Sequence, residues 1–156
     1  MDDKFLEWLN KNEEHYALID KSYKKYKQSK YKLADTKGII VNTELATYGD
    51  AVLKLALCQI LWDENITELT ERKKIYEMDK TLVGIIAKKY ELLNYIMYDK
   101  DDANMVKDYD YKDDKHKFIA TAVEACLGAI YLEKGMDIVL EIIKDWKDLI
   151  DKNNDI

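Results

Sequence analysis

The segment "NTELATYGDAVLKLAL", residues 42–57, limits most strongly what this chain can fold into. Only two residues in 51–62 are polar, which predicts a helix over about 43–62 with little surface facing water. Gly49 and Asp50 stand inside this helix. Glycine weakens a helix interior by about 1 kcal/mol relative to alanine, and a carboxylate on an apolar element is costly without a partner, a proton or a metal ion. Something other than folding therefore selects this pair.

A second apolar segment, "KFIATAVEACLGAIYL" at residues 117–132, also carries one acid, Glu124. Small side chains lie within a turn of Asp50 or Glu124, namely Ala46, Thr47, Ala120, Thr121 and Gly128. These niches leave room for a hydrated ion or for a closely approaching backbone. Mg²⁺ suits them because it prefers carboxylate oxygens, keeps several waters and can activate water against a phosphodiester. The alternative is that each acid caps a helix, pairs locally or faces water.

The composition favours an all-α fold in a single domain over residues 1–156. The chain has no proline and only five glycines, and good helix formers are plentiful. We expect helices near residues 3–10, 12–30, 43–62, 68–78, 80–97, 116–133 and 136–151. Asn42 or Thr43 is expected to cap the third of these, and Gly135 to end the sixth. The charged segment 99–115 is expected to be a mobile connector.

Lysines gather in segment 21–32, "KSYKKYKQSKYK", which holds six of them and no acid in a chain of net charge −6. Such a basic stripe on an acidic protein is typical of a surface that binds a polyanion, and it equally fits a solvated helix face. Tyr16, Ile19, Tyr23 and Tyr26 follow helical spacing. We therefore expect these side chains to pack inward rather than to stack on bases.

The ends and the cysteines bear on the compartment. The start, "MDDKFLEWLNKNEE", is too acidic and polar for a secretory signal, and no apolar run approaches the roughly 20 residues of a membrane span. Cys58 and Cys126 lie in apolar segments, where a thiol packs as a small hydrophobe, so a disulfide framework is not expected. The sequence predicts a cytoplasmic protein with no membrane partner.

Four motifs carry a resemblance to a known family. "NTELATYGDAVLKL" resembles the signature of the ribonuclease III domain, N-E-R-L-E-F-L-G-D-A-V-L, and "FIATAVEACLGAIYLEKG", residues 118–135, is similar to its later motif, S-I-L-A-D-x-x-E-A-L-I-G-A-I-Y-L-D-x-G. "ALIDKSY", residues 17–23, resembles the upstream A-L-T-H-R-S-Y element, and "LTERKKIYEMDKTL", residues 69–82, fits the middle motif. Together they span about residues 17–145, in the family's order. The residues matching the first two motifs are Asn42, Leu45, Gly49, Asp50, Ala51, Val52, Leu53, Glu124, Ala125, Gly128, Ala129, Ile130, Tyr131, Leu132 and Gly135.

The chain departs from the family's acid pattern. The resemblance implies four acids around Mg²⁺, of which Asp50 and Glu124 are present, while Ala46 and Thr121 stand where the other two are expected. Thr43 likewise replaces a glutamate one turn upstream. Either catalysis has been lost, or the chain is related to the short Mini-III branch, which is catalytic with alanine and threonine at these positions. The retained pair of costly acids favours the active enzyme.

The resemblance implies an all-α, bundle-like ribonuclease III-type domain that forms a homodimer with a groove for double-stranded RNA. It implies a Mg²⁺-dependent endoribonuclease of RNA or rRNA processing, with Mn²⁺ able to substitute. A non-catalytic RNA- or ribosome-binding protein on the same fold is the alternative, and a helical adaptor with no nucleic-acid role is a third possibility.

The same resemblance assigns roles to residues of this chain. Asp50 and Glu124 are the expected catalytic residues and metal ligands, and Thr47 and Thr121 are expected to position water at the metal. The positions expected to support the site are Asn42, Ala46, Thr47, Gly49 and Thr121. The expected contacts with the RNA backbone are Lys21, Lys24, Lys25, Arg72 and Lys73.

Overall fold

The computed structural model describes residues 2–30, 38–102 and 116–154 of the chain. Its elements are α1 (Lys4–Lys11), η1 (Tyr16–Leu18), α2 (Tyr23–Lys30), α3 (Thr43–Asp63), α4 (Leu69–Glu77), α5 (Asp79–Thr81), the π-helix η2 (Leu82–Ala87), α6 (Lys88–Tyr90), η3 (Leu92–Asn94), α7 (Lys117–Lys134) and α8 (Met136–Asn153). Over these residues there is no strand, only an isolated bridge between Ile19 and Met97. The predicted all-α fold is confirmed.

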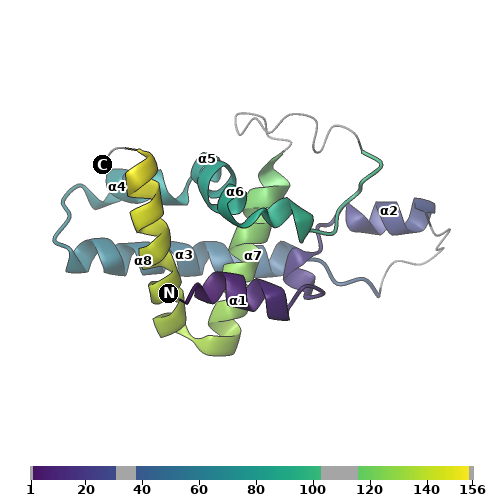
Figure 1. Cartoon of the computed structure of the whole chain (residues 1–156), viewed down its shortest axis with the longest axis horizontal. Coiled ribbons are helices and arrows are strands. Elements are labelled where there is room, and N and C mark those ends of the chain that lie inside the picture. The colour runs from purple at the N-terminus through teal and green to yellow at the C-terminus, as the bar shows by residue number, and fades with distance from the viewer. Residues whose placement is uncertain (1, 31–37, 103–115, 155–156) are drawn as a thin grey trace.

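Helices α3 and α7 form the centre of the molecule, because both are apolar around most of their circumference. Both α7 and α8 cross α3 (Figure 1), and the most extensive packing between elements is that of α3 on α7. Helix α7 is the more deeply enclosed of the two, with an unbroken buried run over residues 125–130. The predicted helices over 43–62 and 116–133 are therefore confirmed as the core of the fold.

Two glycines allow the backbones of α3 and α7 to touch where they cross. A Cβ atom built on Gly49 would lie 1.6 Å from the carbonyl oxygen of Glu124, and one built on Gly128 would lie 2.5 Å from that of Leu45. No side chain fits at such distances, so only glycine permits this crossing. The closely approaching backbone expected beside the two acids is thus present. For Gly49 the expectation that something other than folding selects it is wrong, because the packing of α3 on α7 itself requires glycine there.

Helix α8 covers one side of the crossing and fastens the N-terminal helix to it. The ring of its buried Trp146 packs edge-on against Phe5 of α1, with ring centroids 4.9 Å apart. The indole Nε1 of Trp146 donates to the hydroxyl of Tyr90 at 3.1 Å, and that hydroxyl donates to the carboxylate of Asp3. The two ends of the described chain are thereby held on the same core.

Two of the predicted helices are wrong in their extent. Residues 12–30 do not form one helix, because the chain between η1 and α2 is extended and pairs with the segment around Met97: Met97 donates to the carbonyl of Leu18 at 2.8 Å, and Asp20 donates to that of Met97 at 2.9 Å. The helix predicted over 80–97 ends early, because Glu91 adopts a left-handed backbone with φ of 50°.

The break in the first of these helices divides the expected inward-facing stripe, of which Ile19 is half-buried. Tyr16 is 37% exposed, and Tyr23 and Tyr26 are half-buried and stack on each other with ring centroids 5.7 Å apart. Local spacing suggested one helical face, but long-range pairing of the backbone divides it.

The predicted ends of the two central helices are confirmed in position. Asn42 occupies the N-cap position of α3, but its buried amide donates to the carbonyl of Ala17 at 3.1 Å instead of capping the helix. Gly135 ends α7 with φ of 87°, a conformation that favours glycine. Of the expected connector 99–115, residues 103–115 lie outside the described part of the chain. No described helix is long and apolar enough to cross a membrane.

Candidate active site

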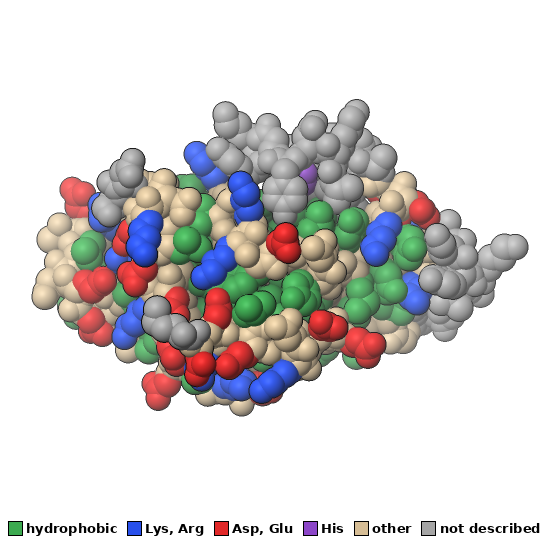
Figure 2. All heavy atoms as spheres, in the orientation of Figure 1, with side chains coloured by type: hydrophobic (Ala, Val, Ile, Leu, Met, Phe, Trp, Pro, Cys, Tyr) green, Lys and Arg blue, Asp and Glu red, His purple; other side chains and the backbone are tan. Residues whose placement is uncertain are grey.

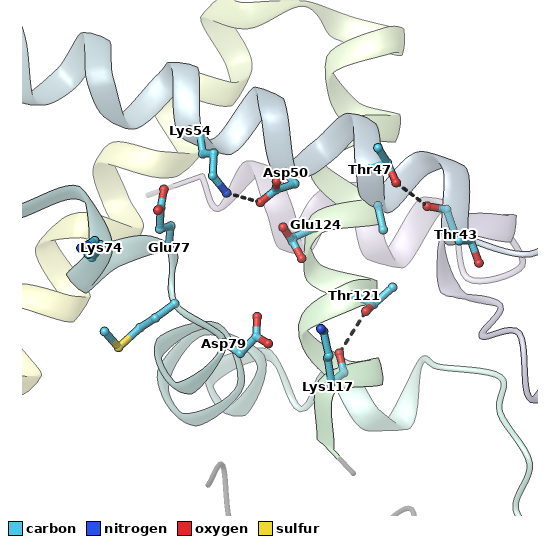
Figure 3. A pocket seen from close by; sticks show the side chains of 12 residues that line it. Thr43, Thr47, Asp50, Lys54, Lys74, Glu77, Asp79, Lys117, Thr121 and Glu124 are labelled. Atoms are coloured by element: carbon cyan, nitrogen blue, oxygen red, sulfur yellow. Dashed lines mark hydrogen bonds and ion pairs between the residues drawn. The ribbon is translucent and has the colours of Figure 1, made fainter. Parts of the chain in front are cut away.

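Asp50 on α3 and Glu124 on α7 lie near each other in the same wall of a pocket of about 680 Å³ (Figure 3). The helix crossing at Gly49 brings them together, and the junction of α4 and α5 forms the opposite wall. The pocket is lined by Thr43, Ala46, Thr47, Asp50, Lys54, Lys74, Glu77, Met78, Asp79, Lys117, Thr121 and Glu124. The two acids that the sequence singles out therefore share one site.

Glu124 is held largely in its protonated form by this environment. Burial raises the pKa of its carboxyl to about 8, and the hydrogen bond to Asp50 and the negative charges of Asp50 and Asp79 act in the same direction. In Figure 3 the Asp79 carboxylate points into the space beside Glu124. An acid that keeps its proton near neutral pH in a pocket is typical of a functional site.

Asp50 behaves in the opposite way, because it has a cation beside it. Burial acts to raise the pKa of Asp50, but hydrogen bonds from Glu124 and Lys54 and the positive charges of Lys54 and Lys73 outweigh burial and lower it. The ammonium Nζ of Lys54 lies 2.5 Å from Oδ1 of Asp50, one helical turn further along α3. Asp50 is thus an ionised carboxylate that accepts from two neighbours.

The other residues predicted to support the site differ in where they lie relative to the pocket. Ala46, Thr47 and Thr121 line the pocket. Both hydroxyls donate to their own helices, Thr47 to the carbonyl of Thr43 at 3.3 Å and Thr121 to that of Lys117 at 3.0 Å. Gly49 lies behind the pocket at the crossing. The amide of Asn42 is turned to the backbone of Ala17 instead.

These residues offer a divalent cation a small but suitable set of ligands. Among the described residues, no group of three or more histidine, cysteine or acidic side chains is arranged to hold a metal ion. Asp50 and Glu124 supply hard oxygen atoms, and Mg²⁺ is often held by only one or two carboxylates with water completing its shell. Two carboxyl groups that share one proton in a pocket fit a divalent cation, because its charge would satisfy both.

The sequence did not single out five charged residues of the pocket. They are Lys54, Lys74, Glu77, Asp79 and Lys117. Lys54 had a local signal, since it lies four residues after Asp50 on the same helix face. Glu77 and Asp79 lie in the middle motif, residues 69–82, but the motif alone did not show that they reach the pocket. They reach it because α4 packs on α3 and η2, which follows α5, packs on α7.

The five cations expected to contact RNA do not line this pocket. Lys21, Lys24 and Lys25 belong to α2 and the turn before it, at the far end of the molecule (right in Figure 1). Lys73 forms an ion pair with Glu77 at 2.8 Å, and Nε of Arg72 is buried without a hydrogen-bond partner. On the face in Figure 2, acidic and basic side chains are interspersed rather than gathered into one basic stripe.

A second surface feature follows the exposed side of α3. Tyr48, Leu55 and Trp62 are exposed there although they are large and apolar, and Leu55 and Trp62 are 59% and 74% exposed. Tyr48 and Leu55 line a shallow apolar depression that Tyr131 and Met136 complete. Large exposed apolar patches on a protein surface commonly belong to interaction sites, and these side chains are the candidates for one on α3.

Comparison with known proteins gives this arrangement its context. The model of the ribonuclease III domain matches residues 43–135, a range that contains every residue lining the pocket. The chain is similar to ribonuclease 3 of Clostridium tetani, with 31% identity over 143 residues that cover 88% of this chain and 54% of the relative. It is also similar to ribonuclease 3 of Sulfurovum sp., with 32% identity over 81% of this chain and 50% of the relative. The chain spans about half the length of the curated relatives it matches.

The fold has a counterpart among solved structures. The nuclease domain of ribonuclease III from Campylobacter jejuni superposes with a TM-score of 0.69 at 25% sequence identity, covering 99% of this chain and 100% of that one. A second structure of that nuclease domain superposes with a TM-score of 0.68. In the first of these two structures, a region of that protein involved in dimer formation is structurally flexible.

Proposed function

The chain belongs to the ribonuclease III domain family, and from this premise we propose that it is a divalent-metal-dependent endoribonuclease that hydrolyses double-stranded RNA. The observation that carries the proposal is the meeting of Asp50 and Glu124, from two separate helices, in one pocket. Two acids from separate helices line the same wall, and the raised pKa of Glu124 beside ionised Asp50 marks a place that a cation would stabilise. Nothing in the packing of the core requires either acid.

Asp50 and Glu124 would hold the metal ion, Mg²⁺ or Mn²⁺, whose charge activates a water molecule and stabilises the negative charge that develops on the phosphate. Thr47 and Thr121 line the same pocket, and their hydroxyl oxygens can accept hydrogen bonds from water that they orient. Lys117 is exposed at the start of α7 and lies at the rim of the pocket. Its positive charge would attract the phosphates of the RNA backbone. The products would carry a 5′-phosphate and a 3′-hydroxyl.

The RNA would be recognised by its shape and its phosphates rather than by its sequence. The side chains of Lys21 and Lys25 are exposed, so they are available to contact the backbone of a duplex that extends beyond the pocket. Processing of cellular RNA, including rRNA, in the cytoplasm is the role that suits such an enzyme.

A homodimer formed through the exposed side of α3 would complete the enzyme. Tyr48, Leu55 and Trp62 expose apolar surface beside a depression that a second copy of the helix fills. A two-fold arrangement would place one pocket on each subunit, so one duplex would meet two sites.

One observation favours a second candidate, a non-catalytic RNA- or ribosome-binding protein on the same fold. Ala46 and Thr121 line the pocket without contributing carboxylates, so few ligands remain for a cation. Such a protein would bind duplex RNA with a strong salt dependence but would not cut it.

The deciding experiment is incubation of the protein with a long duplex RNA of arbitrary sequence at low salt, with Mg²⁺, with Mn²⁺ and with EDTA. We expect cleavage with either metal and none with EDTA, and a much slower reaction for Glu124→Gln. Binding without cleavage at high concentrations of both metals would decide for the second candidate.

A further inference from the structure

Lys54 lines the pocket beside Asp50 but has no part in the chemistry proposed above. Its ammonium lies against Asp50, and the carboxylates of Glu77 and Glu124 are close enough to favour its charge. In Figure 3 the Lys54 side chain reaches from α3 toward the space between these acids. The ammonium is thus a cation already present at the carboxylate pair.

The other lysines of the pocket are placed differently. The ammonium of Lys74 reaches Glu71 at 3.5 Å, an exposed acid that is not part of the pocket lining. Lys117 is exposed at the first residue of α7. Of these three lysines, only Lys54 forms an ion pair with Asp50 or Glu124.

We propose that Lys54 is the resident counter-cation of the Asp50–Glu124 site. Its ammonium competes with a divalent ion for Asp50. Once displaced from Asp50, the ammonium stays in the pocket with its charge toward the RNA phosphate. The inference rests on the proposed function and names a residue that acts on both the metal and the substrate. It predicts opposite effects of Lys54 on these two ligands, since its charge opposes binding of a cation and favours binding of an anion.

The geometry allows such an exchange. The side chain of Lys54 is 43% exposed, so its flexible stem has space to move within the pocket. A half-exposed ion pair between single charges is weak, and a divalent cation carries twice the charge toward the same carboxylate. After displacement the ammonium stays within reach of the pocket because its backbone is fixed one turn from Asp50 on α3.

An ordinary helix-surface pair makes a different prediction. Pairs spaced i to i+4 commonly stabilise a helix slightly and do nothing else. Glu71 and Lys74 on α4, three residues apart and both exposed, form a surface pair of this kind at 3.5 Å. If Lys54 had only this role, its removal would alter the stability of α3 without changing the affinity for a metal ion.

The test compares Lys54→Met, which keeps the length and loses the charge, with Lys54→Arg, which keeps the charge, and with Lys74→Met as a matched control. Mn²⁺ is titrated into the RNA-free protein by calorimetry. We expect Lys54→Met to bind Mn²⁺ about two- to fivefold more tightly, the range that an exposed ion pair can account for. Lys54→Arg and Lys74→Met should bind Mn²⁺ as the wild type does.

The second measurement is the rate of duplex RNA cleavage at saturating Mn²⁺. Lys54→Met should reduce kcat about tenfold or more, as expected when one positioned charge is lost from the transition state, and Lys54→Arg should restore most of it. Circular dichroism of each variant monitors the helical fold.

The outcomes separate the two proposals. Unchanged or weaker Mn²⁺ binding by Lys54→Met would overturn the competition, and tighter binding with an unchanged kcat would overturn the role toward phosphate. If the wild type bound Mn²⁺ but cut no RNA, the proposed nuclease function would fail, whereas the affinity of Lys54→Met would still decide whether Lys54 is the counter-cation.

Discussion

The carboxyl groups of Asp50 on α3 and Glu124 on α7 lie beside each other in one pocket, where the two helices cross. The pKa values of the two groups shift in opposite directions. Burial and the charges of Asp50 and Asp79 raise the pKa of Glu124 against the opposing charge of Lys54, while Lys54, which is paired directly with Asp50, helps to lower the pKa of Asp50 despite its partial burial. The pair therefore holds one proton near neutral pH, and that proton has consequences that stability measurements detect.

The first prediction concerns stability in the metal-free protein. Glu124 ionises near its ordinary pKa of 4.5 in the unfolded chain but only near a pKa of about 8 in the folded one. Between these values the folded state holds a proton that the unfolded state has lost, so the free energy of unfolding falls as pH rises. The slope is at most about 1.4 kcal/mol per pH unit, and partial exposure of the carboxyl makes it smaller.

Urea unfolding in EDTA between pH 5 and pH 8 measures this slope. Glu124→Gln should flatten it, because the amide does not titrate, whereas Glu141→Gln on the exposed side of α8 should leave it unchanged. Equal slopes in the wild type and Glu124→Gln would show that Glu124 is not the group that takes up the proton.

The second prediction concerns the glycine at the helix crossing. Gly49→Ala places a methyl group at a position 1.6 Å from the carbonyl oxygen of Glu124, so α3 and α7 must separate. We expect a loss of about 3 kcal/mol or more in the free energy of unfolding, at the upper end of overpacking penalties, because backbone rather than a flexible side chain is in the way.

Gly38→Ala is the control for this substitution, since nothing lies within 4 Å of a Cβ at Gly38. Chemical denaturation of both variants gives the comparison. A small effect of Gly49→Ala would mean that the backbones of α3 and α7 do not touch at this glycine.

The third prediction concerns the two acids themselves. Asp50→Ala and Glu124→Ala should each reduce cleavage of duplex RNA by roughly 10³-fold or more, as expected when a residue essential for charge stabilisation is lost. Both should retain the helical spectrum, because neither acid packs in the apolar core. Glu71→Ala, an exposed acid of α4, serves as the control. A near wild-type rate in either pocket variant would exclude that acid from the reaction.

The fourth prediction concerns assembly. Leu55→Glu should convert a dimer to a monomer, because a charge at the exposed side of α3 would be buried between subunits. Ile40→Glu changes a side chain that is 63% exposed but lies before α3 begins, and it should leave the dimer intact. Sedimentation velocity at several concentrations measures both. A wild type that sediments as a monomer at every concentration would contradict the two-site model.

The sequence predicts the two central helices well because their apolar character is a local property. It also identifies Gly49 as costly in a helix, but its contact with the backbone of Glu124 lies between segments far apart in the chain. The same limit explains the wrong helix over 12–30, which long-range hydrogen bonds to Met97 interrupt. Glu77 and Asp79 were missed as pocket residues for this reason, since only the tertiary packing of α4 and α5 brings them to Glu124.

The last prediction asks what a larger set of carboxylates would do. Ala46 and Thr121 line the pocket beside Asp50 and Glu124, so Ala46→Glu combined with Thr121→Asp would direct two more carboxylates toward the same space. More ligand charge strengthens the hold on a cation. The concentration of Mg²⁺ or Mn²⁺ that gives half-maximal cleavage should therefore fall.

The same double variant should lose stability in EDTA, because the added charges repel Asp50 and favour still more protonation of Glu124 when no cation is present. Saturating Mn²⁺ should restore that stability, since an ion that binds only the folded state stabilises it by mass action. Cleavage rates against metal concentration, with thermal unfolding in EDTA and in Mn²⁺, measure both effects. If the double variant needed as much metal as the wild type and Mn²⁺ did not stabilise it, these positions would not face the cation, and the pocket would not be the metal site.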